Sequence, residues 1–221
     1  MSVEVERKFL CNADTLKTLE EIGAVCIGQC QFHDRYFDTP EFSLTLKDMW
    51  LRQRKGCWEL KCPTAVEGPE ETTGEQSEAA ALCTRYKEIT NLPEIQQRVR
   101  EVIKDVCEDG ETSFSQKDGQ AWLSEMNLVC FAEFTTVRRT FSLEEDGVRI
   151  DLDQADFGYH VGEIEVLLPE GGDVQLALEK IERTARKLGL TGDKRVQGKM
   201  NIYLQRNHPE HYAKLLRERV M

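Results

Sequence analysis

The feature that most constrains the fold of this chain is a set of like-charged residue pairs, spaced two apart within strand-like segments. The pairs are Glu4 and Glu6, Arg52 and Arg54, Asp151 and Asp153, and Glu163 and Glu165. Successive side chains of a strand point to opposite faces, so the members of each pair share a face and repel each other. A solvated outer face of an antiparallel sheet would explain any one pair. Together the pairs favour polar faces turned toward a water-filled barrel interior, with apolar faces packed against outer helices.

Hydrophobic periodicity supports such an arrangement. Period-two alternation predicts strands over 3–9, 25–38, 49–62, from 86 onward, and over 127–143, 147–153, 161–168 and about 198–204. Helical spacing predicts helices over 14–24, 92–107, 174–188 and about 209–219. Roughly eight strands with peripheral helices predict an α+β fold, and this number suits a closed barrel. We expect one barrel domain over 1–206 with a mobile acidic loop at 63–83, and a C-terminal helix over 207–221.

Charge and composition exclude several classes of protein. The 221 residues include 40 Asp and Glu against 29 Lys and Arg, a net charge of −11, which speaks against nucleic-acid binding. No apolar run is long enough to cross a bilayer, and the acidic N-terminus does not resemble a signal peptide. The eight cysteines form no Cys-x-x-Cys pair, so we interpret them as free thiols. We therefore expect a soluble cytoplasmic protein without a nucleic-acid or membrane partner.

The polar faces carry two kinds of chemistry. Carboxylates are the hard oxygen ligands that Mg²⁺ or Mn²⁺ prefers. They are Glu4, Glu6, Asp151, Asp153, Glu163 and Glu165, of which Asp153 is the least convincing. The cations that can neutralise phosphate oxygens are Lys8, Arg52, Arg54, Lys61, Arg138 and Lys199. The two sets together favour a polyphosphate ligand with a divalent metal.

Several segments, in their order along the chain, resemble the CYTH or triphosphate tunnel metalloenzyme superfamily. The first is Glu4-Val5-Glu6-Arg7-Lys8, a Glu-x-Glu-x-Lys signature. The others are Tyr36–Pro40, Trp50–Arg54, Trp58–Pro63, Tyr86–Glu88, Arg149–Tyr159, Gly162–Glu165 and Tyr203–Arg206. The resemblance covers residues 3 to about 212 and is strongest to the vertebrate members that act on thiamine triphosphate.

This resemblance implies an eight-stranded antiparallel barrel that hydrolyses thiamine triphosphate to thiamine diphosphate and phosphate, with Mg²⁺, as a cytosolic monomer. By matching position, it implies metal ligands at Glu4, Glu6, Asp151, Glu163 and Glu165. It implies triphosphate contacts at Lys8, Arg52, Arg54, Lys61, Arg138 and Lys199. Arg139 adjoins Arg138 and would point the other way, and alignment on Phe134 favours Arg138.

Two further roles concern the thiamine and the attacking water. Trp50 would stack on the thiazolium, since an indole face attracts a cation, and it shares a strand face with Arg52. The alternative is that Trp50 is an ordinary core residue. The resemblance also implies that Tyr36 and Lys61 form a catalytic pair that supplies the base for the attacking water.

Three alternatives stay open. The same barrel could act on inorganic tripolyphosphate, a nucleoside triphosphate or an RNA triphosphate, or as an adenylyl cyclase, because fold does not fix activity. A non-catalytic polyphosphate-binding module would lack some of the carboxylates that bind the metal, whereas all the Glu positions are present here. A β-structural interaction protein would have an apolar barrel interior and a wet exterior for Glu4, Arg52 and Glu163.

Overall fold

The computed structural model describes residues 2–64, 80–104, 121–144, 147–192 and 194–221. These residues form two compact units. The first unit contains Met1–Phe32, Thr64–Lys87 and Thr135–Ile202, and the second contains His33–Pro63, Glu88–Phe134 and Tyr203–Met221. Positions 65–79 of the predicted acidic loop and 105–107 of the second predicted helix lie outside the described residues.

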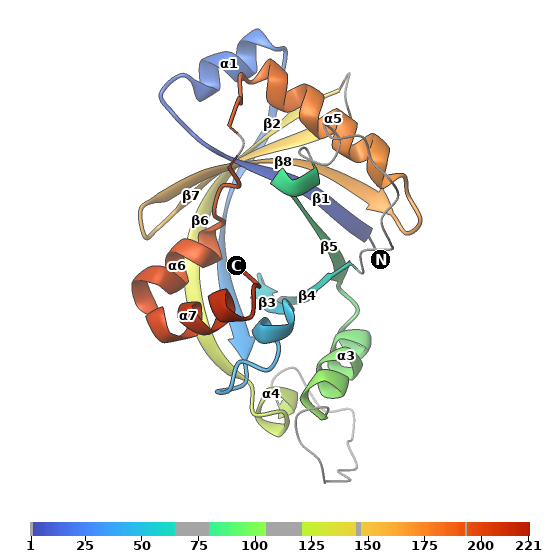
Figure 1. The fold of residues 1–221 in the computed structure, drawn as a ribbon, viewed down its shortest axis with the longest axis vertical. Coiled ribbons are helices and arrows are strands. Elements are labelled where there is room, and N and C mark those ends of the chain that lie inside the picture. Colours follow the sequence, from blue (N-terminus) through green and yellow to red (C-terminus); the bar gives the residue numbers. More distant parts are fainter. Residues whose placement is uncertain (1, 65–79, 105–120, 145–146, 193) are drawn as a thin grey trace. The chain divides into compact units, whose positions relative to one another are not determined.

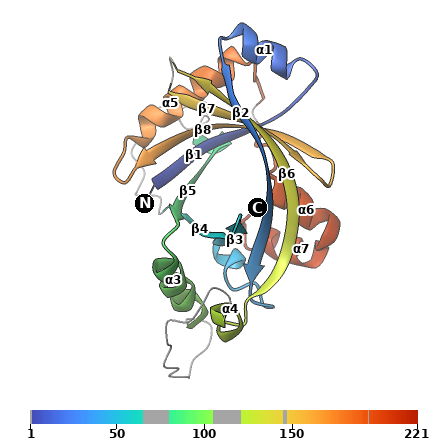
Figure 2. The same ribbon diagram turned by 180° about the vertical axis from the view of Figure 1, so that it is seen from behind.

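Eight strands of the described chain form one closed barrel in the order β1-β5-β4-β3-β2-β6-β7-β8, which confirms the predicted fold class. Their bounds are β1 (Ser2–Leu10), β2 (Val25–Asp38), β3 (Trp50–Arg54), β4 (Cys57–Pro63), β5 (Cys83–Ile89), β6 (Val129–Leu143), β7 (Val148–Ala155) and β8 (Tyr159–Pro169). The long strands β2 and β6 are neighbours in this order (Figure 2).

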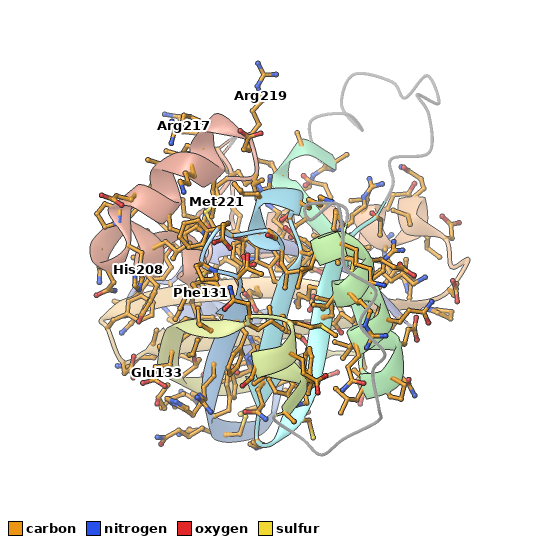
Figure 3. All side chains as sticks on the ribbon, turned by 90° about the horizontal axis from the view of Figure 1, so that it is seen from below. Phe131, Glu133, His208, Arg217, Arg219 and Met221 are labelled. Atoms are coloured by element: carbon orange, nitrogen blue, oxygen red, sulfur yellow. The ribbon has the colours of Figure 1, made fainter. Side chains whose placement is uncertain are left out.

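The helices are α1 (Thr15–Glu21), the short 3₁₀ helix η1 (Thr45–Lys47), α3 (Leu92–Lys104), α4 (Ala121–Glu125), α5 (Val174–Lys187), α6 (Lys199–Asn207) and α7 (Pro209–Arg217). No helix of the described chain has the length and apolar composition that a membrane crossing requires. In the second unit, His208 is the N-cap of α7, and Arg219 extends away beyond the end of this helix (Figure 3).

Two sequence-based predictions are wrong, and one short α-helix was missed, as was the 3₁₀ helix η1. Residues 49–62 form two strands, because Lys55 and Gly56 take φ angles of 51° and 79° and make a tight hairpin turn. The strand predicted near 198–204 is α6 instead. Met200, Tyr203 and Leu204 also fit helical spacing, and so short a run satisfies both periods. The two errors cancel in the count of strands. The missed α-helix, α4, has five residues, too few for a periodic signal.

In the first unit, α5 covers one face of the sheet formed by β1, β7 and β8 (Figure 1). Asp173 caps this helix by accepting a hydrogen bond from the backbone N–H of Leu176 at 3.0 Å. Val5, Ile150 and Ile164 of the strands pack with Ile181 of the helix, and all four side chains are fully buried. The apolar faces of these strands therefore form a core with a helix, as the alternation predicts.

The second unit follows the same rule with other elements. Leu51 and Leu60 of the β3–β4 hairpin pack with Ile95 and Val99 of α3, and Trp58 packs edge-on against Trp122 of α4. In each unit the like-charged pairs of the strands consequently lie on the face opposite to the helix-covered one, whereas Arg7 lies on the helix-covered face and pairs with Glu182 of α5 at 2.8 Å. A closed barrel turns the face of the like-charged pairs inward.

Candidate active site

The first unit gathers buried carboxylates on one face of β1, β7 and β8. In the β1–β8 register Glu6 lies opposite Glu165, and in the β7–β8 register Asp151 lies opposite Glu163. Residues opposite each other in neighbouring strands share a face, so the predicted same-face grouping is present. All six predicted carboxylates are buried: Glu4, Glu6, Asp151, Asp153, Glu163 and Glu165.

Arg138 is the central cation of this carboxylate face. Its Nε and Nη2 donate to Oδ1 and Oδ2 of Asp153 at 2.6 and 2.7 Å, and Nη2 also donates to Oε2 of Glu163 at 2.9 Å. Its Nη1 lies 2.6 Å from Oδ2 of Asp151. Burial alone would lower the pKa of Arg138, but these carboxylates outweigh it and raise the pKa. Arg139 lies on the other face over the ring of Phe141, so the two adjacent arginines point apart as expected.

Two predicted lysines also lie at this face. Lys8 donates to Oε1 of Glu6, and its Nζ is 3.8 Å from Oε1 of Glu163. Lys199, the first residue of α6, donates to Oδ2 of Asp153. The structure thus brings Lys8, Arg138 and Lys199 together with the carboxylates. Asp153 is bound by two cations, which fits its place as the least convincing metal ligand.

Three further residues of this face had no predicted role. Arg149 donates from Nε to Oδ1 of Asp151 at 3.1 Å, and Thr140 donates to the same oxygen at 2.6 Å. Thr84 of β5 donates to Oε1 of Glu6 at 2.9 Å. The two-residue spacing of Thr140 from Arg138, and of Arg149 from Asp151, is the signal that could have identified the β6 and β7 residues.

The carboxylate face fits a divalent cation by its charge and donor chemistry. Six carboxyl groups lie with the four cations Lys8, Arg138, Arg149 and Lys199, which leaves one surplus negative charge when Glu165 holds a proton. Burial, followed by the charge of Glu4, with Asp151 and Glu163 adding, raises the pKa of Glu165 to about 8. Oδ2 of Asp151 is buried and has ion-pair contacts but no hydrogen bond. In the described chain the carboxylates pair with Arg and Lys, and no three His, Cys, Asp or Glu residues are arranged to enclose an ion.

The second unit carries a cationic strand face formed by β2, β3 and β4. Arg54 donates from Nε and Nη2 to the two carboxylate oxygens of Asp34 at 2.6 and 2.7 Å. Arg52 donates to Oε1 of Glu59, its opposite neighbour on β4. Nζ of Lys61 lies 3.2 Å from Oε1 of Glu88. The three predicted cations therefore lie on one face, each beside a carboxylate.

These partner carboxylates were not predicted. Asp34 is spaced two and four residues from Tyr36 and Asp38 on β2, so the alternation that revealed the other pairs could have revealed it. Glu59 lies two residues before Lys61, and both were placed on one face from the sequence. The ion pair of Asp34 depends on the pairing of β2 with β3, and that of Glu59 on the pairing of β3 with β4, neither of which the sequence alone gave.

Tyr36 lies opposite Arg52 in the β2–β3 register and hydrogen-bonds to it. Its ring stacks on Phe134 with 5.8 Å between centroids. Burial raises the pKa of Tyr36, although the charges of Arg52 and Arg54 act against this rise. The phenol is therefore protonated near neutral pH, where it can donate a hydrogen bond to a substrate oxygen.

Trp50 lies opposite Lys61 in the β3–β4 register, on the same strand face. Its side chain is 9% exposed, and its Nε1 donates to Oδ1 of Asp48 at 2.8 Å. The indole is thus fixed in its plane beside the cationic residues. The structure places Trp50 where the sequence analysis expected it, on the face shared by Arg52, Arg54 and Lys61.

Comparison with known proteins places the chain in a family. The CYTH domain matches residues 2–198, so the chain belongs to the CYTH family. It is 40% identical over 224 residues to thiamine-triphosphatase of Homo sapiens, covering 97% of this chain and 89% of the relative. It is 38% identical to thiamine-triphosphatase of Macaca fascicularis, with the same coverage. A solved structure from Pyrococcus horikoshii, 20% identical, shares the fold with a TM-score of 0.57 over 92% of this chain and 99% of that one.

Proposed function

We propose that this protein hydrolyses the terminal phosphoanhydride of thiamine triphosphate, giving thiamine diphosphate and phosphate. The identity of 40% to a thiamine-triphosphatase over nearly the whole chain supports this proposal. The structural observation that carries it is the indole of Trp50 on the strand face of Arg52, Arg54 and Lys61. Cations suit the triphosphate and an indole face suits the thiazolium, so one face offers both halves of this substrate.

The divalent metal is Mg²⁺ in this proposal, with Mn²⁺ as a possible substitute. Its ligands are Glu4, Glu6, Asp151, Glu163 and Glu165. Two observations support this set: the surplus of negative charge on the carboxylate face and the raised pKa of Glu165. When bound, the metal supplies positive charge to the phosphoryl oxygens as negative charge develops on them. The carboxylates orient it and give up the proton of Glu165. Asp153 instead anchors Arg138 and Lys199.

The cations bind and polarise the triphosphate. They are Lys8, Arg52, Arg54, Lys61, Arg138 and Lys199, and each now contacts a carboxylate of its own unit. Phosphate oxygens take over some of these contacts when the substrate binds. Phosphoryl transfer needs chiefly positioning and charge neutralisation, and fixed guanidinium and ammonium groups provide both without reorganising at the moment of reaction.

Tyr36 and Lys61 are the proposed catalytic pair. The raised pKa of Tyr36 means that the phenol keeps its proton, so it donates a hydrogen bond to a phosphoryl oxygen and does not act as the base. Lys61 neutralises charge on the transferred phosphoryl group, and Glu88, 3.2 Å away, positions its ammonium. Water attacks the terminal phosphorus in line while the bond from phosphorus to the bridging oxygen breaks. Thiamine diphosphate leaves with that oxygen, one proton of the water stays on the released phosphate, and the other goes to solvent.

The second candidate is inorganic tripolyphosphate or a nucleoside triphosphate on the same cationic face. It explains the arginines and lysines equally well, but gives no role to the indole. Two further expectations, a monomeric state and a cytoplasmic location, rest on the sequence resemblance.

Product analysis tests the proposed reaction. Purified protein is incubated with thiamine triphosphate and Mg²⁺, and the products are separated by chromatography. We expect thiamine diphosphate and phosphate in equal amounts, and no turnover when EDTA replaces Mg²⁺. Release of diphosphate with thiamine monophosphate would contradict the proposed bond cleavage, and full turnover in EDTA would contradict the metal.

A further inference from the structure

Asp48 is held rigidly at the entrance to β3 by a buried network in the second unit. The carboxylate of Asp38 is fully buried and accepts four hydrogen bonds. Two come from the backbone N–H groups of Thr39 and Leu44, and two from the N–H and hydroxyl of Thr45, all at 2.7–2.9 Å. The backbone N–H of Asp48 then donates to the carbonyl of Thr45 at 3.0 Å. These bonds therefore hold the backbone of the loop from which the Asp48 side chain extends.

The network extends to the C-terminal helix α7. Nε2 of His211 lies 2.8 Å from Oγ1 of Thr45. Since the hydroxyl proton of Thr45 goes to Asp38, Nε2 of His211 must be the donor to Thr45, and the ring is the neutral Nε2–H tautomer. Phe42 stacks on this ring with 3.7 Å between centroids. The loop that carries Asp48 is thus clamped from α7 as well as from β2.

Asp48 has an unusual backbone conformation for a residue other than glycine. Its φ is 55°, in the left-handed region, where glycine meets no steric cost and Asp is tolerated. Glycine would satisfy the turn alone. The carboxylate accepts a hydrogen bond from the indole Nε1 of Trp50 at 2.8 Å, which glycine could not do.

A cationic ring stacked on Trp50 would lie close to two cations of the same strand face, each of which pairs with a carboxylate. Lys61 lies directly opposite Trp50, and Arg52 lies two residues along the same strand face. Both cations suit a triphosphate and repel a thiazolium. A carboxylate at the edge of the indole opposes this repulsion. Because it accepts a hydrogen bond from the indole N–H, it also increases the negative charge of the ring face.

We infer that Asp48 is a specificity-determining residue that attracts the thiazolium cation of the substrate and fixes Trp50 to receive it. This inference rests on the proposed function and names the group that separates thiamine triphosphate from triphosphates without a cationic ring. Asp48 acts on binding of the heterocycle, and the phosphoryl-transfer step is left to the other residues. A cation stacked on the indole lies within about 6 Å of the ring centroid, a range at which a carboxylate at the ring edge still acts on it.

The test compares two substrates in three variants. Asp48→Asn keeps an acceptor for Trp50 and tolerates the left-handed backbone, but removes the charge. Asp48→Ala removes both acceptor and charge. Glu41→Gln is the matched control, because Glu41 is an exposed carboxylate of the same loop. We expect Asp48→Asn to raise KM for thiamine triphosphate about tenfold and to change KM for tripolyphosphate less than about twofold. Asp48→Ala should raise the first KM further, and Glu41→Gln should change neither.

A substrate analogue and a double variant separate charge from structure. An analogue of thiamine triphosphate with an uncharged thiophene in place of the thiazolium should show equal KM values in the wild type and Asp48→Asn. In a Trp50→Ala background, Asp48→Asn should raise KM for thiamine triphosphate less than in the wild type. The analogue also tests the wild type alone, where it should bind about tenfold more weakly than the natural substrate, even if the variants fail to fold.

The outcomes distinguish this inference from the proposed function. Equal changes in KM for thiamine triphosphate and tripolyphosphate in Asp48→Asn, or no change in either, would overturn the role of Asp48. Equal affinity of the wild type for thiamine triphosphate and for its uncharged thiophene analogue would also overturn the role of Asp48. A wild type that turns over tripolyphosphate but not thiamine triphosphate would overturn the proposed function and this inference together.

Discussion

Arg138 donates from Nε and Nη2 to both carboxylate oxygens of Asp153, at 2.6 and 2.7 Å, in a bidentate ion pair on the carboxylate face. The side chain of Asp153 is fully buried and that of Arg138 is 12% exposed. Removing one partner of so buried a pair leaves an uncompensated charge. We expect Arg138→Ala to reduce the free energy of unfolding by about 3 kcal/mol, as measured by urea denaturation.

The neighbouring arginine provides the control. Arg139 lies over the ring of Phe141 on the other face, so Arg139→Ala should cost less than about 1 kcal/mol. Asp153→Asn added to Arg138→Ala should restore part of the lost stability, because it removes the stranded charge. Equal destabilisation by Arg138→Ala and Arg139→Ala would show that the carboxylate face does not depend on Arg138.

Lys61→Ala should impair turnover more than folding. Its side chain is 21% exposed and its ion pair with Glu88, at 3.2 Å, contributes little to stability in a partly wet position. We expect kcat for thiamine triphosphate to fall at least about 100-fold, as for the loss of one charge-stabilising group in other enzymes. The melting temperature should change by only a few degrees.

Lys87→Ala is the matched control. Lys87 lies on β5 and, like Lys61, pairs with a glutamate; its Nζ is 3.4 Å from Oε1 of Glu170. It should leave kcat unchanged. If phosphate release by Lys61→Ala equals that of the wild type, Lys61 has no catalytic role.

Glu165 should couple metal binding to proton release. Its pKa is raised to about 8 chiefly by burial and by the charge of Glu4, so at pH 7 the metal-free protein holds a proton there. A metal ligand must be deprotonated, so Mg²⁺ binding at pH 7 should release close to one proton and binding at pH 9 almost none. Calorimetric titration in two buffers of different ionisation enthalpy measures this number.

The Glu165→Gln variant supplies the control for this titration, because an amide releases no proton. It should bind Mg²⁺ more weakly and without proton release at either pH. A proton release that is the same in Glu165→Gln and in the wild type would assign the titrating group elsewhere.

His211 should make stability depend on pH. Burial, with smaller contributions from His208 and Lys214, lowers the pKa of His211 to about 4, whereas an unfolded histidine titrates near about 6.5. Below pH 6.5 His211 binds a proton in the unfolded chain but not in the folded protein. The contribution of neutral His211 to the free energy of unfolding is therefore full above this pH. It is lost progressively as the pH falls toward 4, by at most about 3 kcal/mol.

Urea denaturation of His211→Gln between pH 4 and 7.5 tests this dependence. Glutamine can still donate to Thr45 but does not titrate, so the difference from the wild type should shrink as the pH falls. The exposed His160 is the control, and His160→Gln should run parallel to the wild type. A constant difference between His211→Gln and the wild type across this range would contradict the buried neutral histidine.

The sequence was sufficient for the grouping of charges because it depends only on the two-residue period of a strand. Glu6 and Glu165, or Asp151 and Glu163, share a face however the loops between them run, once the strands pair. The opposite orientation of Arg138 and Arg139 followed from the same rule. Helices α3 and α5 were equally clear, since each carries a long apolar stripe.

What the sequence did not provide depends on contacts between distant segments. The hydrogen bond of Asp48 with Trp50 requires a left-handed residue in a loop, and Lys47-Asp48-Met49 carries no glycine to indicate one. The link from Asp38 through Thr45 to His211 joins positions 166 residues apart at its last step. Helix α6 was mistaken for a strand because Met200, Ile202 and Leu204 alternate over too few residues to decide between the two periods.

The central claim is that the cationic and carboxylate faces serve a metal-dependent hydrolase selective for thiamine triphosphate. Its most direct test is kcat/KM of the purified protein for thiamine triphosphate, tripolyphosphate and ATP, each with Mg²⁺ and with EDTA. We predict the highest value for thiamine triphosphate with Mg²⁺ and background rates for all three substrates in EDTA. A kcat/KM for tripolyphosphate or ATP that equals or exceeds the value for thiamine triphosphate, or rates that EDTA leaves unchanged, would contradict the account.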